Sequence, residues 1–195
     1  MPSILPTLAA NPVIAAVRSD DQLARALDTP VRVIFLLGGD PESLPGRVQK
    51  ARSAEKLVFV HMDLVEGFSR DACGLKWLAH TARPSGILST RAPILRAAAA
   101  EENLLTVLRI FMVDSSSLAT GVRMVKSCEP TLIEVMPGLV TRAIRRLSES
   151  VRQPVIAGGM LEAEQDVAAA LNAGALAAST SSEILWARSG ACLKR

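Results

Sequence analysis

The stretch Pro154–Thr180, PVIAGGMLEAEQDVAAALNAGALAAST, decides the fold. A short apolar run ends at Gly158 and Gly159, an amphipathic helix pattern follows, and a second small apolar run ends at Ser179 and Thr180. This order predicts a strand, a glycine turn, a helix and a second strand. Unhindered backbone N–H groups after the first strand and small hydroxyls after the second can hold a phosphate. In a (β/α)8 barrel, phosphates bind at the loops after strands seven and eight.

The rest of the chain repeats the same alternation of strand and helix. Most of the apolar runs are continuous, which is typical of parallel strands covered by helices. The predicted strands are Pro12–Val17, Val31–Leu37, Leu57–Leu64, Gly86–Ser89, Leu104–Val113, Thr131–Val135, Pro154–Ala157 and Ala175–Ser179. Eight such units predict a compact α/β fold, the (β/α)8 or TIM barrel, and a doubly wound open sheet is the alternative. The absence of GxGxxG after the first strand favours the barrel.

Capping residues mark the helices between these strands. Ser19 or Asp20 begins a helix through Leu27, Ser69 or Asp71 begins one through Ala79, and Asp114 with Ser115 begins one through Ser127. A further helix is predicted over Leu161–Leu171, and a weaker one over Asp40–Lys50, where Pro45 and Gly46 interrupt the pattern.

The composition indicates one globular domain over residues 1–195, because 49% of the residues are hydrophobic and no linker divides the chain. No apolar run approaches the roughly 18 residues that cross a bilayer, and the N-terminus lacks the pattern of a signal peptide, so we expect no membrane partner. Cys73, Cys128 and Cys192 are far apart, which argues against disulfides or a zinc site and favours the cytoplasm.

The net charge of +3, carried mostly by arginine, permits polyanion binding without requiring it. Aromatic residues make up only 3% of the chain and tyrosine is absent. Recognition of RNA by ranks of stacked bases is therefore not expected, and any nucleic-acid contact would depend on arginine and on shape.

Polar residues interrupt the apolar strands near their carboxyl ends, where a barrel builds its site. They are Arg18, His61, Asp63, Arg109 and Glu134. Because His61 and Asp63 are two residues apart, a continuous strand would place them on one face. We expect these five to surround a small ligand, with Arg109 balancing the two carboxylates and the phosphate against the glycine turn.

Structural roles compete with this interpretation. His61 could be a satisfied core histidine, Asp63 and Glu134 could pair with Arg109 as a purely structural network, and Arg18 could be a solvated strand end. The glycine pair could only make a turn, and the Ser–Thr doublet could only cap the last helix. Catalytic signatures are weak: no lysine occupies a predicted strand, so a Schiff base lacks a nucleophile. His61 with Asp63 could act as acid and base or hold Mg²⁺, but nothing in the spacing supports a metal or a cofactor.

With these residues in view, the chain resembles the glycerol-uptake operon antiterminator regulatory family from about Asn11 to Trp186. The joint order of two motifs, VHMDLVEG within Val58–Ser69 and IEVMPG at Ile133–Gly138, carries the resemblance most specifically. The other matching segments are NPVIAAVR (11–18), VIFLLGGD (33–40), GILSTRAPILRAA (86–98), RIFMVDSSSL (109–118), PVIAGGM (154–160), AAST (177–180) and EILW (183–186).

The resemblance implies a regulator, not an enzyme: a barrel that binds glycerol 3-phosphate and then binds leader mRNA, preventing early termination upstream of glycerol-metabolism genes. The sequence offers an RNA surface at Arg142, Arg145, Arg146 and Arg152, the first three at helical spacing, although a solvated outer face is the simpler interpretation. A second basic pair, Arg91 and Arg96, is expected to start the fourth helix.

Two other functions remain open. One is an enzyme that acts on a small phosphorylated polyol or sugar, and the other is a metabolite-binding protein without RNA contact. A homodimer is also expected to suit RNA binding, because two-fold symmetry doubles a basic surface.

Overall fold

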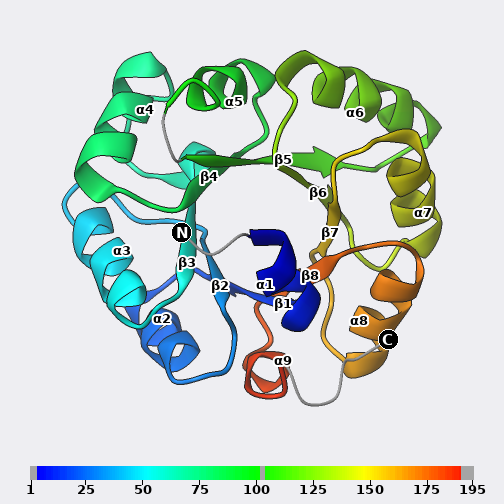
Figure 1. The fold of residues 1–195 in the computed structure, drawn as a ribbon, viewed down its shortest axis with the longest axis horizontal. Helices are drawn as coiled ribbons and strands as arrows, with labels where there is room; N and C mark the ends of the chain where they lie inside the picture. The colour runs from blue at the N-terminus through cyan, green and yellow to red at the C-terminus, as the bar shows by residue number, and fades with distance from the viewer. Residues whose placement is uncertain (1–3, 102–103, 190–195) are drawn as a thin grey trace.

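The protein is a closed parallel β-barrel surrounded by a ring of helices (Figure 1), seen in a computed structural model that describes residues 4–101 and 104–189. The eight strands pair in sequence order, and β1 pairs in parallel with β8 to close the barrel. They are β1 (Val13–Val17), β2 (Val33–Leu36), β3 (Leu57–His61), β4 (Gly86–Ser89), β5 (Leu105–Phe111), β6 (Leu132–Met136), β7 (Val155–Gly158) and β8 (Ala177–Thr180). The predicted (β/α)8 barrel is therefore confirmed, and the open-sheet alternative is wrong because no edge strand remains.

Helices return the chain outside the barrel after each strand. The α-helices are α1 (Ile4–Ala10), α2 (Asp20–Leu27), α3 (Leu44–Ser53), α4 (Ala72–Trp77), α5 (Ala92–Ala98), α6 (Ser115–Cys128), α7 (Thr141–Ser150), α8 (Glu164–Asn172) and α9 (Glu183–Ala187). A 3-10 turn, η1 (Met62–Leu64), follows β3, and a π-helical turn, η2 (Leu78–Ala82), extends α4.

The strand residues divide into two cores because successive side chains point to opposite faces. Residues such as Val58 and Val60 of β3 pack outward against the helices. Their neighbours Leu57 and Phe59 point inward and fill the barrel together with side chains of the other strands. The inward alternation brings His61, Arg109, Glu134 and Ser179 into the upper layer of the interior, toward the carboxyl ends of the strands.

Helix α1 has no counterpart among the sequence-based predictions. It precedes β1 directly, and Figure 1 shows it over one side of the barrel opening, in front of β1 and β8. Ile4 and Leu8 of this helix are buried among the inward residues of the strands. Because β1 begins at the amino-terminal end of the barrel, α1 closes that end, and access to the interior is left to the carboxyl end.

Several local predictions need correction. Strand β3 ends at His61, so Asp63 lies in η1 and the two residues do not share a strand face. Helix α3 does form, because Pro45 lies in its first turn, where its missing N–H costs no hydrogen bond. Arg96 lies in the last turn of α5, and its Nε donates to the carbonyl of Ser127, so only Arg91 is at the start of that helix.

The predicted caps are otherwise present. Ser19 caps α2, Asp71 caps α4, and Asp114 forms a capping box with Ser117 at the start of α6. Side-chain oxygens there accept from the first free N–H groups of each helix. These caps fix the points at which the chain leaves the barrel rim.

Candidate functional site

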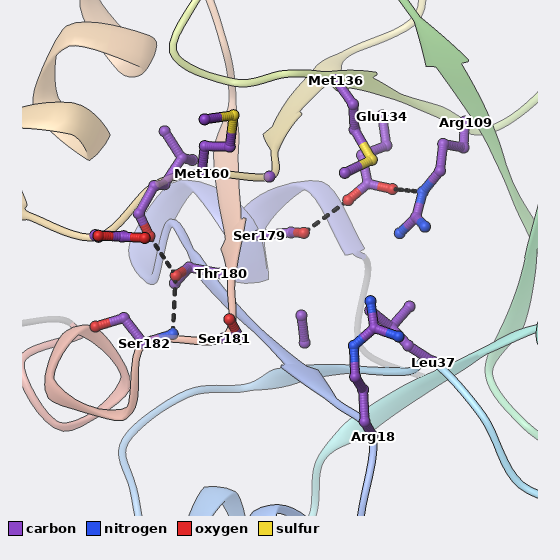
Figure 2. Close-up of a pocket in the computed structure, with 14 residues that line it drawn as sticks. Arg18, Leu37, Arg109, Glu134, Met136, Met160, Ser179, Thr180, Ser181 and Ser182 are labelled. Carbon is purple, nitrogen blue, oxygen red and sulfur yellow. Dashed lines mark hydrogen bonds and ion pairs between the residues drawn. The ribbon is translucent and has the colours of Figure 1, made fainter.

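A cavity of about 410 Å³ opens at the carboxyl end of the barrel, over β1, β5, β6, β7 and β8 (Figure 2). Its volume is in the range of small-ligand clefts, roughly 300–1,000 Å³. Six of the residues predicted from the sequence line it: Arg18, Arg109, Glu134, Gly159, Ser179 and Thr180. Side chains from both ends of the chain thus converge on one rim, as the sequence predicts.

A buried ion pair forms the floor of this rim cavity. Arg109 Nε donates to Glu134 Oε2 at 2.6 Å, and the side chains are 7% and 0% exposed. The strand register places the two residues side by side on β5 and β6. Ser179 Oγ donates to the other carboxylate oxygen at 2.6 Å, so both oxygens of Glu134 are satisfied. A buried carboxylate needs such partners, because desolvating an unpaired charge costs several kcal/mol.

Gly158 gives this carboxylate its space. A Cβ on Gly158 would overlap Oε1 of Glu134, because β7 passes directly beside the Glu134 side chain. Gly158 itself is buried and not among the residues that line the cavity. Gly159 does line it and has a φ of +79°, a conformation that favours glycine. Glycine is therefore needed at position 158 for lack of space and at position 159 for the backbone conformation.

Two guanidinium groups face one another across the cavity. Figure 2 shows Arg18, at the end of β1, extending toward the terminal nitrogens of Arg109. Among the described residues, the Arg18 side chain makes no ion pair and donates no hydrogen bond, and Arg109 donates only through Nε. Like charges repel unless an anion lies between them. The arrangement can therefore hold an anionic group between the two arginines.

The opposite wall of the cavity holds three backbone donors without a partner among the described residues. The N–H groups of Gly159, Met160 and Ser181 donate no hydrogen bond to another described residue. Met160 has a positive φ of 62° beside Gly159, so consecutive residues leave the extended conformation at this turn. Successive free N–H groups form an anion-binding concavity. The free N–H groups thus lie at the predicted glycine turn and just after β8, one or two residues further along the chain than Gly158 and Thr180.

The Ser179 and Thr180 hydroxyls are already engaged within the protein. Ser179 donates to Glu134, and Thr180 Oγ1 donates to the carbonyl of Leu161 and accepts from Ser182 N–H. Thr180 thereby ties the β7–α8 loop to the β8–α9 loop. The next two hydroxyls, Ser181 and Ser182, also line the cavity, and the sequence interpretation missed them although they continue the same polar run.

Asp63 lies outside the residues that line the cavity. One of its oxygens accepts from Ser89 Oγ, and the other accepts from both N–H and Oγ1 of Thr90. Burial opposes ionisation of this carboxyl, but those donors together hold its pKa below the usual value. Asp63 therefore fixes the loop between β4 and α5, and Arg109 pairs with Glu134 alone.

His61 is buried, with 3% exposure, and its Nδ1 has no hydrogen-bond partner among the described residues. Burial and the nearby Arg109 charge lower the pKa of His61 to about 4, against an opposing effect of Asp63. The imidazole is therefore neutral at pH 7. It lies on the inward face of β3, in the same polar layer as the ion pair.

Residues with chemistry for other reactions are placed elsewhere. Lys56 is buried immediately before β3, at the closed end of the barrel, where Nζ donates to the carbonyls of Thr29 and Val31. Within residues 4–101 and 104–189, no three His, Cys, Asp or Glu side chains gather as a metal site would require. Over the same residues no helix has the length and apolar content to cross a bilayer. Cys73 and Cys128 are free thiols, and Cys192 lies outside the described residues.

The four arginines predicted as an RNA surface are all exposed but do not form one patch. Arg142, Arg145 and Arg146 lie on α7, which begins at the open rim. Arg152 follows the end of α7, beside the start of β7, at the closed end of the barrel. At 1.5 Å per residue, the helix separates the two ends by about 15 Å. Only Arg142 and Arg146 line a second depression, between α6 and α7.

The closed barrel and its rim cavity define the class of protein: a small (β/α)8 barrel with a polar cavity at the carboxyl ends of β7, β8 and β1. The model of one family, described as "Glycerol-3-phosphate responsive antiterminator", matches residues 13–186, and the chain belongs to this family.

Similar proteins agree with this membership. A solved glycerol uptake operon antiterminator regulatory protein from Listeria monocytogenes str. 4b F2365 has a TM-score of 0.85 and 30% identity, covering 89% of this chain and 94% of that one. A glycerol uptake operon antiterminator-related protein from Thermotoga maritima MSB8 has a TM-score of 0.77 and 28% identity, covering 89% and 96%. "Uncharacterized protein YgcP" of Escherichia coli K12 is 37% identical over 183 residues, 94% of this chain and 95% of that protein. Solved aldolases of 12% to 14% identity share the fold alone.

Proposed function

We propose that the protein is a sensor of glycerol 3-phosphate that binds leader mRNA of glycerol-metabolism genes and prevents early termination of transcription. The observation that carries this proposal is the rim cavity, in which the Arg18 guanidinium and the terminal nitrogens of Arg109 lie opposite backbone N–H groups that have no partner among the described residues. The family gives the effector, the cavity has the size for it, and Arg18 supplies a guanidinium with no ion-pair partner among the described residues, although Glu162 also lines the cavity.

The two ends of the effector would meet different walls. A phosphate would accept from the N–H groups of Gly159, Met160 and Ser181, with Arg18 completing its charge balance. The glycerol hydroxyls would then reach the floor, where Arg109 has free terminal nitrogens and Ser182 a free hydroxyl. A neutral His61 would add an acceptor or a donor in the same layer. Effector binding would order the rim loops and raise the population of the RNA-binding state.

The direct test measures both ligands on the full chain. Glycerol 3-phosphate at 100 times its dissociation constant stabilises the native state by about 2.7 kcal/mol, which corresponds to a Tm increase of roughly 5–10 °C for this size. Glycerol alone should give no increase, and inorganic phosphate a smaller one. A mobility-shift assay with the 5′ leader transcript of a glycerol-uptake gene from the same genome should show an effector-dependent complex. Binding of neither ligand would contradict the proposal.

An enzyme acting on a phosphorylated polyol or sugar is the competing function. An aldolase that uses a Schiff base needs a lysine at the rim, and the buried Lys56 lies at the other end. Asp63, a candidate acid or base, is committed to Ser89 and Thr90. Turnover of phosphorylated polyols by the purified protein, lost in Asp63→Asn with binding retained, would favour the enzyme.

A further inference from the structure

A second depression, which we call the α6–α7 groove, lies on the outside of the barrel at the same rim. It has a volume of about 540 Å³ and is lined by residues at the starts of α6 and α7. These two helices are neighbours in the ring around the barrel (Figure 1). Met112, Val113 and Leu118 line it from the β5–α6 side, and Val140, Arg142 and Arg146 line it from the α7 side.

Two of the apolar side chains that line the groove are exposed to solvent. Val113 is 80% exposed and Val140 is 42% exposed, although branched apolar side chains are usually buried. Both residues lie in loops that join a strand to a helix, outside the helices themselves. Contiguous exposed apolar side chains rimmed by polar residues are typical of interaction sites.

The charge of the groove is positive. Arg142 and Arg146 lie one turn apart on α7, and neither forms an ion pair with a carboxylate among the described residues. Asp114 also lines the groove, but its Oδ1 accepts from the N–H and hydroxyl groups of Ser116 and Ser117. The groove therefore carries two guanidinium groups against one carboxylate, and neither guanidinium is paired with that carboxylate.

We propose that the α6–α7 groove receives an unstacked base of the RNA, with the phosphates on either side of that base bound by Arg142 and Arg146. This inference rests on the proposed function and names the RNA-contacting surface, which the family membership leaves open. A nucleotide combines a flat apolar face with a charged backbone, and the groove offers the complement of both. A pocket for a single base does not need a row of stacked aromatic side chains, and the chain has few aromatic residues.

A second copy of this chain is a poorer occupant. In a two-fold dimer the same patch faces itself, so Arg142 and Arg146 would lie against the same arginines of the other copy. Asp114 is the one carboxylate among the residues that line the groove, and two arginines outnumber it, so each copy would present a net positive face to the other. The charge therefore favours a polyanion.

The groove is joined to the effector cavity by the ends of β5 and β6. Met112 lines the groove and Met136 lines the rim cavity, and Met112 N–H donates to the Met136 carbonyl at 2.7 Å. Arg109 and Glu134, the floor of the cavity, lie two or three residues before these methionines on the same strands. An effector that repositions Arg109 would act on the ends of both strands, and so on the shape of the groove.

The experiment compares RNA affinity and its salt dependence at saturating glycerol 3-phosphate, using the 5′ leader transcript as probe. The test variants are Arg142→Ala with Arg146→Ala, and Val113→Glu, which adds a negative charge at a highly exposed position. Arg152→Ala is the matched control, because it removes an exposed arginine at the other end of the same helix. We expect both test variants to bind at least about tenfold more weakly. The slope of log affinity against log salt should fall by about 1.4 in the double variant, since each single-strand phosphate contact contributes about 0.7.

The outcomes separate this inference from the proposed function. All variants should keep the Tm increase with glycerol 3-phosphate, because none of the substituted residues lines the rim cavity. Wild-type RNA binding that the test variants leave unchanged would overturn the groove while sparing the proposed function. Loss of a dimer in the test variants with RNA affinity intact would assign the groove to self-association and also overturn the inference. Absence of RNA binding by the wild type would contradict both the proposed function and the assignment of the groove.

Discussion

Arg109 and Glu134 occupy directly paired positions on β5 and β6, and their side chains meet in a buried ion pair at 2.6 Å. The pair leaves the two terminal nitrogens of Arg109 facing the cavity, toward Arg18 (Figure 2). One residue is therefore both a structural partner of a buried carboxylate and a candidate ligand of an anion. Most of the predictions below separate these two roles.

Replacing Glu134 with Gln should destabilise the protein by about 3 kcal/mol, because the buried Arg109 charge loses its counterion. Urea unfolding monitored by circular dichroism measures the change. Replacing both residues with methionine should restore much of that stability and abolish the effector-dependent Tm increase. Retention of effector binding in the double variant would show that the pair is structural only.

Replacing Arg18 with Ala should weaken glycerol 3-phosphate binding by roughly 10- to 100-fold, the value of a charge-assisted hydrogen bond to phosphate. Stability without ligand should change by less than about 0.5 kcal/mol, because Arg18 is exposed and its side chain makes no hydrogen bond or ion pair with a described residue. Arg32→Ala is a suitable control, since Arg32 is exposed at the closed end of the barrel. Calorimetric titration distinguishes the two, and equal affinities would remove Arg18 from the site.

Replacing Gly158 with Ala should destabilise the protein by about 1–3 kcal/mol through overpacking against the Glu134 carboxylate. The backbone conformation is not the cause, because Gly158 is not among the glycines with positive φ. Combining Gly158→Ala with Glu134→Ala should therefore cost less than the sum of the single changes in denaturant unfolding. Additive effects would point to another source of strain.

Stability should fall as pH decreases from about 6.5 to about 4. His61 has a pKa of about 4 in the folded protein, below its usual 6.5, so the unfolded chain binds more protons in this window. The slope attributable to this histidine is at most about 1.4 kcal/mol per pH unit. His61→Gln should remove most of that slope, as measured by urea unfolding at pH 7.5, 5.5 and 4.5. An unchanged slope would mean that another group dominates.

Trp186 should report effector binding by fluorescence. Its indole Nε1 donates to the carbonyl of Thr180 at 2.8 Å, and Thr180 lines the cavity. The chain has two tryptophans, so Trp77→Phe isolates this signal. We expect a saturable change in emission with glycerol 3-phosphate and none with glycerol. A constant signal under conditions where the Tm rises would indicate that the β8–α9 loop does not move.

The barrel was predictable because the sequence signals for its strands and helices are local. Continuous apolar runs such as Val155–Gly158 and capping residues such as Ser19 and Asp114 act within a few residues. Their number and order leave few ways to cover every strand. Helix α1 was not predicted because a seven-residue helix carries too short a pattern, and its burial against the amino-terminal end of the barrel stabilises it.

The convergence of Arg18, Arg109, Glu134 and Gly159 was also predictable, since parallel strands bring their carboxyl ends to one rim. Which side chain each of these residues contacts was not predictable from the sequence. Asp63 was expected to face the ligand, yet β3 ends before it and the 3-10 turn directs its carboxylate to Ser89 and Thr90.

The sequence alone determined the order of strands and helices and the set of polar residues at their ends, because side-chain direction alternates along a strand whatever its neighbours are. Tertiary structure alone decided which groups meet: Glu134 with Arg109 and Ser179, residues 25 and 45 positions away, and Met112 with Met136 between the two cavities. Those contacts depend on strand register and on closure of β8 against β1, which are set by packing over the whole barrel and not by any local pattern.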